Sequence, residues 1–285
     1  MLLDDVRRRV GMSVLTRVAG PDALERRERV RAPSGERWFE RTSPITIVHA
    51  DSSMFIGGMR ALLLQSLHPL AMAGVADHSG FRGDPWGRLQ RTAAFLGTTT
   101  FGTALDAQRA IARVRGAHRR VHGIAPDGRA YSAGDPDLLR WVHVAEVDSF
   151  LAAHDRYGSR RLSAEQRDEY VAQTAVVARE LGATDVPETV GELRDSLWAY
   201  RPDLASTPAA RSTARYLLLH PPVPLPLRGP YTAMAAASVG LLPRWARFPL
   251  RLPYLPVTEA TVVRVGGRAF TEGVRWVMRP VDAQR

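Results

Sequence analysis

The chain has 285 residues, of which 45% are hydrophobic, so it is long enough for one large domain with a substantial core. It contains no cysteine, which excludes disulfides, thiolate-bound haem, cysteine-held iron–sulfur clusters and a cysteine nucleophile. Any metal chemistry must therefore use histidine, carboxylate or tyrosine side chains. The formal net charge is +10 at pH 7, and arginine dominates the 39 basic residues.

A basic charge of this size is compatible with binding to a nucleic acid or to an anionic membrane surface, and also with the absence of any anionic partner. The arginines are scattered, and no basic helix alternates with aromatic side chains on which bases could stack, so we expect no nucleic-acid partner. Residues 1–10 lack the apolar stretch of a secretory signal, and the longest uncharged run, residues 61–76, is too short for an ordinary membrane span. We therefore expect a cytoplasmic location, with contact to a membrane surface left open.

Charged residues dominate the first part of the chain, and glycine- and proline-containing breaks interrupt its helical pattern. We expect residues 1–42 to form an N-terminal helical arm and residues 43–285 to form the main domain. Residues 57–75 are apolar and rich in good helix formers. Pro69 should kink or divide this helix, because proline cannot donate a backbone hydrogen bond.

The next predicted helix covers residues 88–96, after a loop at 78–86. It is followed by an apolar stripe whose members recur at spacings of three and four, which is typical of one face of an amphipathic helix. The members of the stripe are Ala104, Ala107, Ile111, Val114, His118 and Val121. His118 therefore lies on an apolar helix face.

Capping residues predict where further helices begin. Asp135 suits the N-cap position and Pro136 the first position of a helix that carries His143. Two capping-box spacings predict helices over 164–181 and 190–200. Long helical periods dominate and convincing alternating strand patterns are absent, so the predicted fold class is all-α, with a single large helical domain.

Prolines dominate the sequence before the last helix. Five of them lie in residues 219–230, which predicts an extended, non-helical connector. Four more lie in residues 240–256, a greasy and basic stretch that either wraps the core as coil or touches a membrane interface. Residues 257–278 should form a closing helix, weakened by Gly266 and Gly267.

Histidine is the residue type that most suggests a metal site in this chain. His118 and His122 share a helix face, but Arg119 stands where a zinc protease needs glutamate. A carboxylate-bridged di-iron bundle needs two Glu-x-x-His pairs, and the chain offers one reversed pair, His143 with Glu146. The histidines are His49, His68, His78, His118, His122, His143, His154 and His220.

A single haem needs only one axial histidine in an apolar pocket, with basic or polar groups near its propionates and open face. His118 suits the ligand position, and Arg115 and Arg119 lie close enough in sequence to meet the propionates. A core histidine without a metal fits the same spacing, so spacing alone leaves both interpretations open. His143 is the second choice of ligand. Nucleophile-elbow, phosphate-loop and dinucleotide-binding motifs are missing, which argues against common hydrolases, nucleotidases and dehydrogenases.

An ordered set of short motifs resembles a known family. They are Gly58 to Gln65, His68-Pro69, Gly74-Val75, His78-Ser79, Asp84-Pro85, Arg88, Arg91-Thr92, Phe101-Gly102, His118-x-x-Val121-x-Gly123 and Trp141 to His143. In this order they resemble the bacterial oxygenase family of MpaB type, which also contains the rubber oxygenases called latex clearing proteins. The resemblance covers about Ser43 to Met278.

The resemblance implies an all-helical, globin-like core that binds haem b through one histidine and reacts with dioxygen. By motif, His118 looks like the iron ligand of the family. The Arg88-x-x-Arg91-Thr92 element is similar to the distal Arg-x-x-Lys-Thr element of rubber oxygenases, with Arg91 in place of lysine. Arg88, Arg91 and Thr92 are therefore the candidate catalytic residues.

Two departures from the rubber oxygenases change the expected substrate. Those enzymes use a distal glutamate as base, whereas Leu70 to Ala76 contains no carboxylate and Asp77 is the nearest substitute. An enzyme for a solid extracellular polymer must also leave the cell. We expect instead the oxidation of a hydrophobic small molecule by dioxygen. Whether the reaction needs an electron donor is left open. His68 and His78 could lie on the distal side of the haem or behind its ligands. The alternative is a non-enzymatic helical protein that binds haem or, as a basic peripheral protein, a membrane surface.

Overall fold

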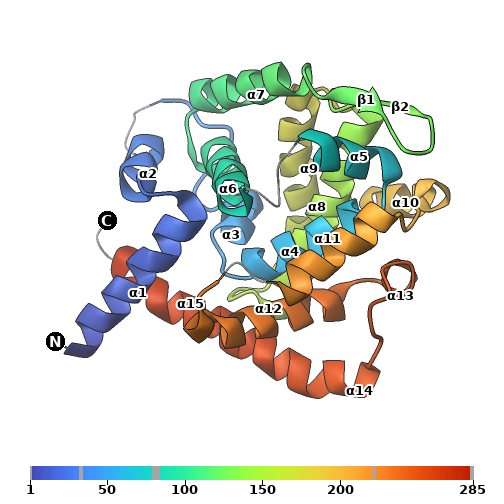
Figure 1. Ribbon diagram of the computed structural model, residues 1–285. Helices are drawn as coiled ribbons and strands as arrows, with labels where there is room; N and C mark the ends of the chain where they lie inside the picture. The colour runs from blue at the N-terminus through green and yellow to red at the C-terminus, as the bar shows by residue number, and fades with distance from the viewer. Residues whose placement is uncertain (1, 32–34, 79–83, 221–222, 283–285) are drawn as a thin grey trace.

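Helices make up 72% of the computed structural model, which describes residues 2–31, 35–78, 84–220 and 223–282 (Figure 1). The predicted all-α fold class is confirmed, and the helices form a single domain. The described residues contain one small two-stranded antiparallel sheet, in which Gly123 pairs with Tyr131.

The helices and strands have the following bounds. The α-helices are α1 (Leu2–Ala19), α2 (Ala23–Arg31), α3 (Pro44–His49), α4 (Met54–Gln65), α5 (Pro69–His78), α6 (Pro85–Phe101), α7 (Ala104–His118), α8 (Pro136–Tyr157), α9 (Ala164–Leu181), α10 (Val190–Ala199), α11 (Pro208–Leu219), α12 (Arg228–Leu241), α13 (Arg244–Arg247), α14 (Pro256–Thr258) and α15 (Arg264–Asp282). The strands are β1 (His122–Ile124) and β2 (Ala130–Ser132). Two 3₁₀ turns cover Arg201–Asp203 and Leu225–Leu227, and a π-helical segment covers Glu259–Val263.

Caps and prolines begin the helices where the sequence indicates. The Asp135 side chain accepts hydrogen bonds from two backbone amides of the first turn of α8, and Pro136 follows at a position that needs no donor. Ser163 forms the predicted capping box at the start of α9. Pro69 divides the apolar run of residues 57–75 into α4 and α5, as expected. At this break the carbonyl of Leu67 accepts a hydrogen bond from the amide of Ala205.

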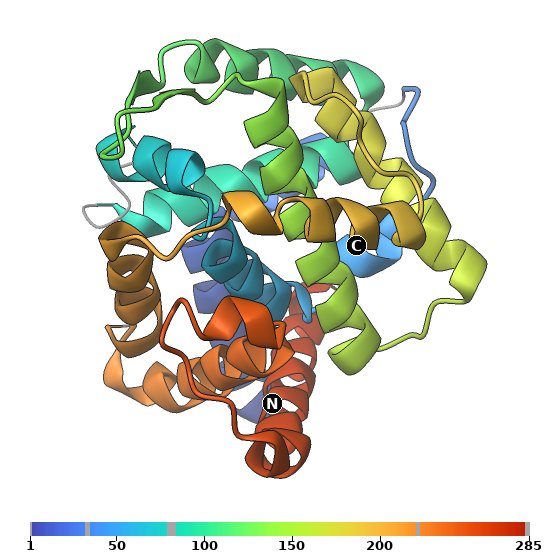
Figure 2. The same ribbon diagram turned by 90° about the vertical axis from the view of Figure 1, so that its right-hand side faces the viewer.

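The centre of the core is the contact between α4 and α8. At Gly57 a Cβ atom would lie 2.8 Å from Phe150 Cδ1 and 3.1 Å from Phe150 Cα, so the helices approach this closely because residue 57 has no side chain. Trp141 and Val144 of α8 are fully buried in the same cluster. Figure 2 shows α8 running through the middle of the molecule, with other helices on either side of it.

A buried arginine fastens the same contact. Arg60 of α4 donates to Asp148 Oδ2 at 2.7 Å, to Ser149 Oγ at 2.6 Å and to the carbonyl of Leu241 at 3.0 Å. Its side chain is only 4% exposed, so the guanidinium needs all of these partners. Arg60 therefore ties α4, α8 and the end of α12 together.

The first and last helices of the described chain, α1 and α15, pack against each other (Figure 1). Helix α1 also packs against α6. Arg7 Nε donates to the carbonyl of Trp276 at 2.6 Å, and the guanidinium lies 4.7 Å from the centre of the indole ring. The predicted arm thus contains α1 and α2, while its boundary at residue 42 stays a prediction.

The expectation of a non-helical connector over residues 219–230 is wrong in part. A 3₁₀ turn covers Leu225–Leu227, and α12 already begins at Arg228. Pro230 is tolerated there because the amides of a first helical turn have no partner inside the helix. The predicted closing helix is confirmed and continues from Pro256 to Asp282 through the π-helical segment. None of the described helices is both long and apolar enough to cross a membrane.

Adding a methyl group at position 57 tests the central contact. Gly57→Ala should lower the free energy of unfolding by about 1–3 kcal/mol, because part of what the new Cβ meets is backbone that cannot swing away. Gly58→Ala is the matched control, since a Cβ at position 58 meets nothing within 4 Å and should stabilise α4 slightly. Urea unfolding of both variants measures the difference, and equal midpoints would contradict the close packing.

Candidate functional site

His118 is the last residue of α7, a helix that starts at the Thr103 cap. Its ring is half-buried, and its Nδ1 atom is buried without a hydrogen-bond partner in the described part of the chain. Burial lowers the pKa of His118 below its ordinary value, so the imidazole is neutral at pH 7. A neutral imidazole is the form that binds a metal, and an unpartnered buried nitrogen is costly unless a ligand satisfies it.

His143 lies in the first half of α8 and resembles His118 in its unpartnered ring nitrogen and its lowered pKa. Its Nε2 atom is buried and has no partner among the residues described. Burial, with a smaller contribution from Arg179, lowers the pKa of His143 to about 4. Both candidate ligands, His118 and His143, are thus neutral and each has an unused ring nitrogen.

Glu146 is a buried carboxyl that follows His143 by one helical turn. Burial raises the pKa of Glu146 to about 7, and none of the described residues forms a hydrogen bond with its carboxyl group. The side chain nevertheless keeps some accessible surface. The sequence indicated Glu146 only as one half of a reversed Glu-x-x-His pair with His143.

His49 of α3 contacts side chains of α6 and α9. Its Nδ1 lies 2.8 Å from Thr100 Oγ1 and its Nε2 lies 3.4 Å from the Tyr170 hydroxyl. The His49 ring also keeps accessible surface although burial lowers its pKa to about 3. Burial and the charge of Glu146 raise the pKa of Tyr170, which places these two side chains near each other. Helices α3, α6, α8 and α9 therefore meet around a polar cluster of His49, Thr100, Tyr170 and Glu146.

The predicted distal residues lie in the first turns of α6, which packs against α7. Arg88 is half-buried, and burial together with the charge of Arg91 lowers its pKa. Arg91 and Thr92 are exposed, and Arg91 lies 3.4 Å from Asp84, the N-cap of the same helix. Arg88 is thus the member of the element that reaches furthest into the protein.

The predicted propionate partners lie at the end of α7, close to His118. Arg115 and Arg119 are both exposed, and neither forms an ion pair with a carboxylate in the described ranges. They are available cations at the surface beside a half-buried imidazole.

His68 and Asp77, two further candidates from the sequence, each have partners that explain their positions in the fold. His68 is buried against the rings of Trp141 and Tyr200, with centroids 6.0 and 6.4 Å away, so it packs as a core residue at the break between α4 and α5. Asp77 accepts a hydrogen bond of 2.7 Å from the Tyr131 hydroxyl, which fastens α5 to β2. The side chain of His78 lies outside the described part of the structure.

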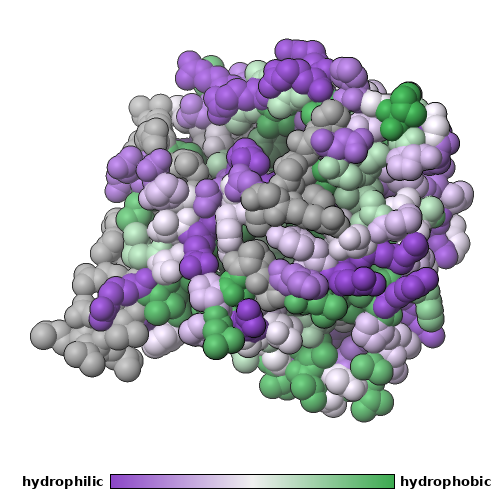
Figure 3. Space-filling model, in the orientation of Figure 1, coloured by the Kyte–Doolittle hydropathy of each residue, from purple (hydrophilic) through white to green (hydrophobic). Residues whose placement is uncertain are grey.

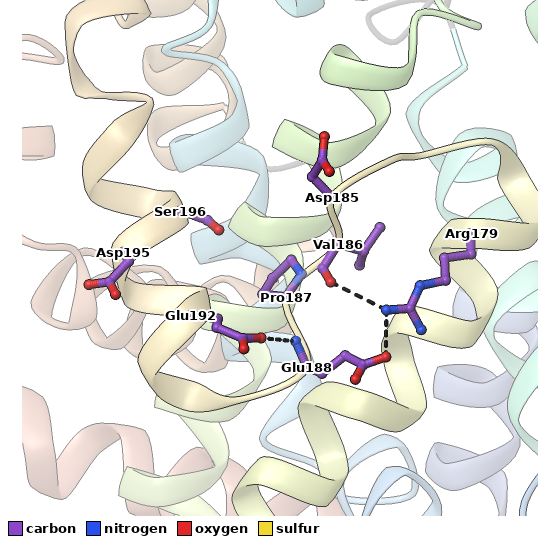
Figure 4. Close-up of a pocket in the computed structure, with 8 residues that line it drawn as sticks. All are labelled: Arg179, Asp185, Val186, Pro187, Glu188, Glu192, Asp195 and Ser196. Atoms are coloured by element: carbon purple, nitrogen blue, oxygen red, sulfur yellow. Dashed lines mark hydrogen bonds and ion pairs between the residues drawn. The ribbon is translucent and has the colours of Figure 1, made fainter.

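A surface depression between α9 and α10 is separate from these residues. Figure 4 shows it lined by the end of α9, the first turns of α10 and the loop between them, and Arg179 there forms an ion pair with Glu188 and donates to the carbonyl of Val186. It contains none of the candidate residues. No group of three or more histidine, aspartate or glutamate side chains is placed to hold a metal ion within the described ranges.

The fold and the site together describe an all-helical protein whose interior holds neutral imidazoles and one desolvated carboxyl. The chain belongs to the family described as ER-bound oxygenase mpaB/B'/Rubber oxygenase, catalytic domain, which matches residues 46–276. The resemblance seen in the sequence is thereby confirmed, and membership indicates an oxygenase. No curated protein and no solved structure matches the chain.

The raised pKa of Glu146 predicts how stability depends on pH. The folded protein holds this proton until about pH 7, whereas the unfolded chain releases it near 4.5, so the free energy of unfolding should fall as pH rises between these values. The loss should reach on the order of 3 kcal/mol above pH 7. Glu146→Gln should remove it, and its stability advantage over the unmodified protein should grow with pH.

Urea unfolding from about pH 5 to pH 8, without added cofactor, measures this difference. Glu180→Gln, which changes an exposed carboxyl on α9, is the matched control and should leave the pH profile unchanged. A Glu146→Gln profile parallel to that of the unmodified protein would show that Glu146 is not desolvated.

Proposed function

We propose that this protein is a haem b-dependent oxygenase that oxidises a hydrophobic small molecule with dioxygen. The observation that carries the proposal is the neutral imidazole of His118, with a buried ring nitrogen that no described residue satisfies. The position of His118 within the matched family domain supports the same role. When bound, haem supplies a redox-active iron that activates dioxygen.

The residues present fit this group. His118 offers a neutral nitrogen to the iron, while Arg115 and Arg119 provide exposed cations for the carboxylates of the propionates. His143 is the alternative ligand, because its Nε2 is buried and unsatisfied in the same way.

The polar residues bind and orient the reactants. Arg88 donates hydrogen bonds to dioxygen or to a polar atom of the substrate, and Arg91 and Thr92 support it from the same turns of α6. Glu146 exchanges a proton near neutral pH, because its pKa is about 7. It thus supplies the carboxyl that Leu70 to Ala76 lacks. If one oxygen atom leaves as water, an external electron donor must provide two electrons.

An absorption spectrum tests the cofactor directly. Protein expressed with a supply of haem should show a Soret band, and His118→Ala should lose or shift this band because the iron loses its axial nitrogen. His143→Ala is the matched comparison and should keep it. Absence of a Soret band both after expression and on haem titration would overturn the proposal, and a band lost only in His143→Ala would move the ligand to α8.

Dioxygen affinity tests the role of Arg88. Arg88→Leu should lower the dioxygen affinity of the reduced, haem-loaded protein by about 10-fold or more, because it removes a hydrogen bond from a charged donor. Arg109→Leu, at an exposed position on α7, is the control and should have no effect. Stopped-flow release of dioxygen measures both variants, and an unchanged rate in Arg88→Leu would remove Arg88 from the site.

A further inference from the structure

Large apolar side chains are exposed together near the C-terminal end of the described chain. Figure 3 shows hydrophobic side chains gathered along the lower edge of the molecule, where α12 to α15 lie in Figure 1. Their exposed fractions are 68% for Phe248, 53% for Leu255, 77% for Val257, 70% for Val262 and 67% for Val265. We call these five residues the C-terminal apolar face. Single exposed hydrophobic residues are ordinary, but five within one short stretch suggest a surface that something covers.

The C-terminal apolar face is held rigidly on the body of the protein. Arg247 beneath it is buried and donates to the carbonyls of Leu242 and Gly240 and to Glu259 Oε1, at 2.8, 2.7 and 2.5 Å. Further along, a Cβ at Gly267 would lie 2.7 Å from the Tyr157 ring, so α15 lies directly on the core there. The inner side of this segment is therefore fully packed, while its outer side is apolar and uncovered.

Positive charge surrounds the apolar face. Arg244, Arg251, Arg264 and Arg268 are all exposed, and none of them pairs with a carboxylate in the described ranges. The one carboxylate between residues 244 and 268 is Glu259, which is bound by the buried Arg247. A second copy of the same face would bring these arginines together, whereas an anionic surface would neutralise them.

We propose that the C-terminal apolar face docks this protein onto the surface of a bilayer that contains anionic phospholipid. The valines, Leu255 and Phe248 enter the boundary between headgroups and acyl chains, and the flanking arginines bind the headgroup phosphates. The Arg244 guanidinium lies 4.4 Å from the centre of the Tyr254 ring. Tyrosine is amphipathic and suits the boundary between headgroups and acyl chains. Docking concerns the outer surface of residues 248–265 and does not depend on the cofactor.

Vesicle flotation tests the proposal with the full chain. Binding to phosphatidylcholine vesicles that contain phosphatidylglycerol should be at least 10-fold stronger than binding to phosphatidylcholine alone, and high salt should weaken it. No binding to either vesicle would overturn the proposal. Equal binding to both would overturn the role of the arginines.

Two double variants locate the surface. Val262→Asp with Val265→Asp should lower binding at least 10-fold, and the matched control, Leu105→Asp with Ile124→Asp, should not, although those side chains are 54% and 66% exposed on α7 and β1. Arg264→Gln with Arg268→Gln should remove the preference for anionic vesicles. Circular dichroism should show unchanged helix content, since all these positions are exposed.

Sedimentation separates the membrane from a second copy of the chain. The unmodified protein should stay monomeric at micromolar concentration, because the arginines repel. A dimer that dissociates on the Val262→Asp and Val265→Asp changes, without vesicle binding, would overturn the proposal and assign the face to self-association. Equal loss of vesicle binding in the control variant would also overturn it.

Discussion

The close contact of α4 with α8 at Gly57 determines how the rest of the protein is arranged. A helix presents side chains every third or fourth residue to one side, so fixing one face of α8 fixes all of them. Trp141 and Val144 are buried in the core with α4, and Arg60 binds Asp148 and Ser149 on the same contact. His143 and Glu146 share a helix face with Phe150, which contacts Gly57 of α4 and lies with its ring centre 5.6 Å from that of His49. The position of α8 against α4 thus also places His143 and Glu146.

Burial favours the uncharged forms of His49, His143 and Glu146. Burial lowers the pKa values of His49 and His143 and raises that of Glu146, while the arginines of the end of α7 stay in water. A neutral interior suits an apolar reactant. Glu146 differs from the histidines because its pKa lies near physiological pH. Of these three groups it is therefore the one that most readily changes its charge near neutral pH.

Local signals predicted the parts of the fold that local chemistry controls. The Asp135 cap, the Ser163 capping box and the break at Pro69 act over a few residues, and each begins or ends a helix where expected. The start of α12 inside a proline-rich stretch was missed, because one proline in a first helical turn looks no different in sequence from one in a loop. The all-α class could be predicted from periodicity alone, because packing preserves the predicted long helices.

The site was less predictable, because burial in three dimensions decides the chemistry of each residue. His118 could be singled out from its apolar stripe, but nothing near Glu146 in the sequence shows that α3 and α9 cover it. Asp77 was considered as a substitute base, yet it receives a hydrogen bond from Tyr131, a residue of the small hairpin that periodicity did not reveal. Asp77 and Glu146 thus have similar local sequences but different roles. Asp77 accepts a hydrogen bond that joins α5 to β2, whereas Glu146 is a desolvated acid.

The pairing of α1 with α15 also has a consequence for folding. Arg7 of α1 binds the carbonyl and the ring of Trp276, which lies 269 residues further along the chain. Contacts between residues so distant in sequence form late, because a long loop must close before they can. We therefore expect α1 to dock onto α15 after the core helices have packed.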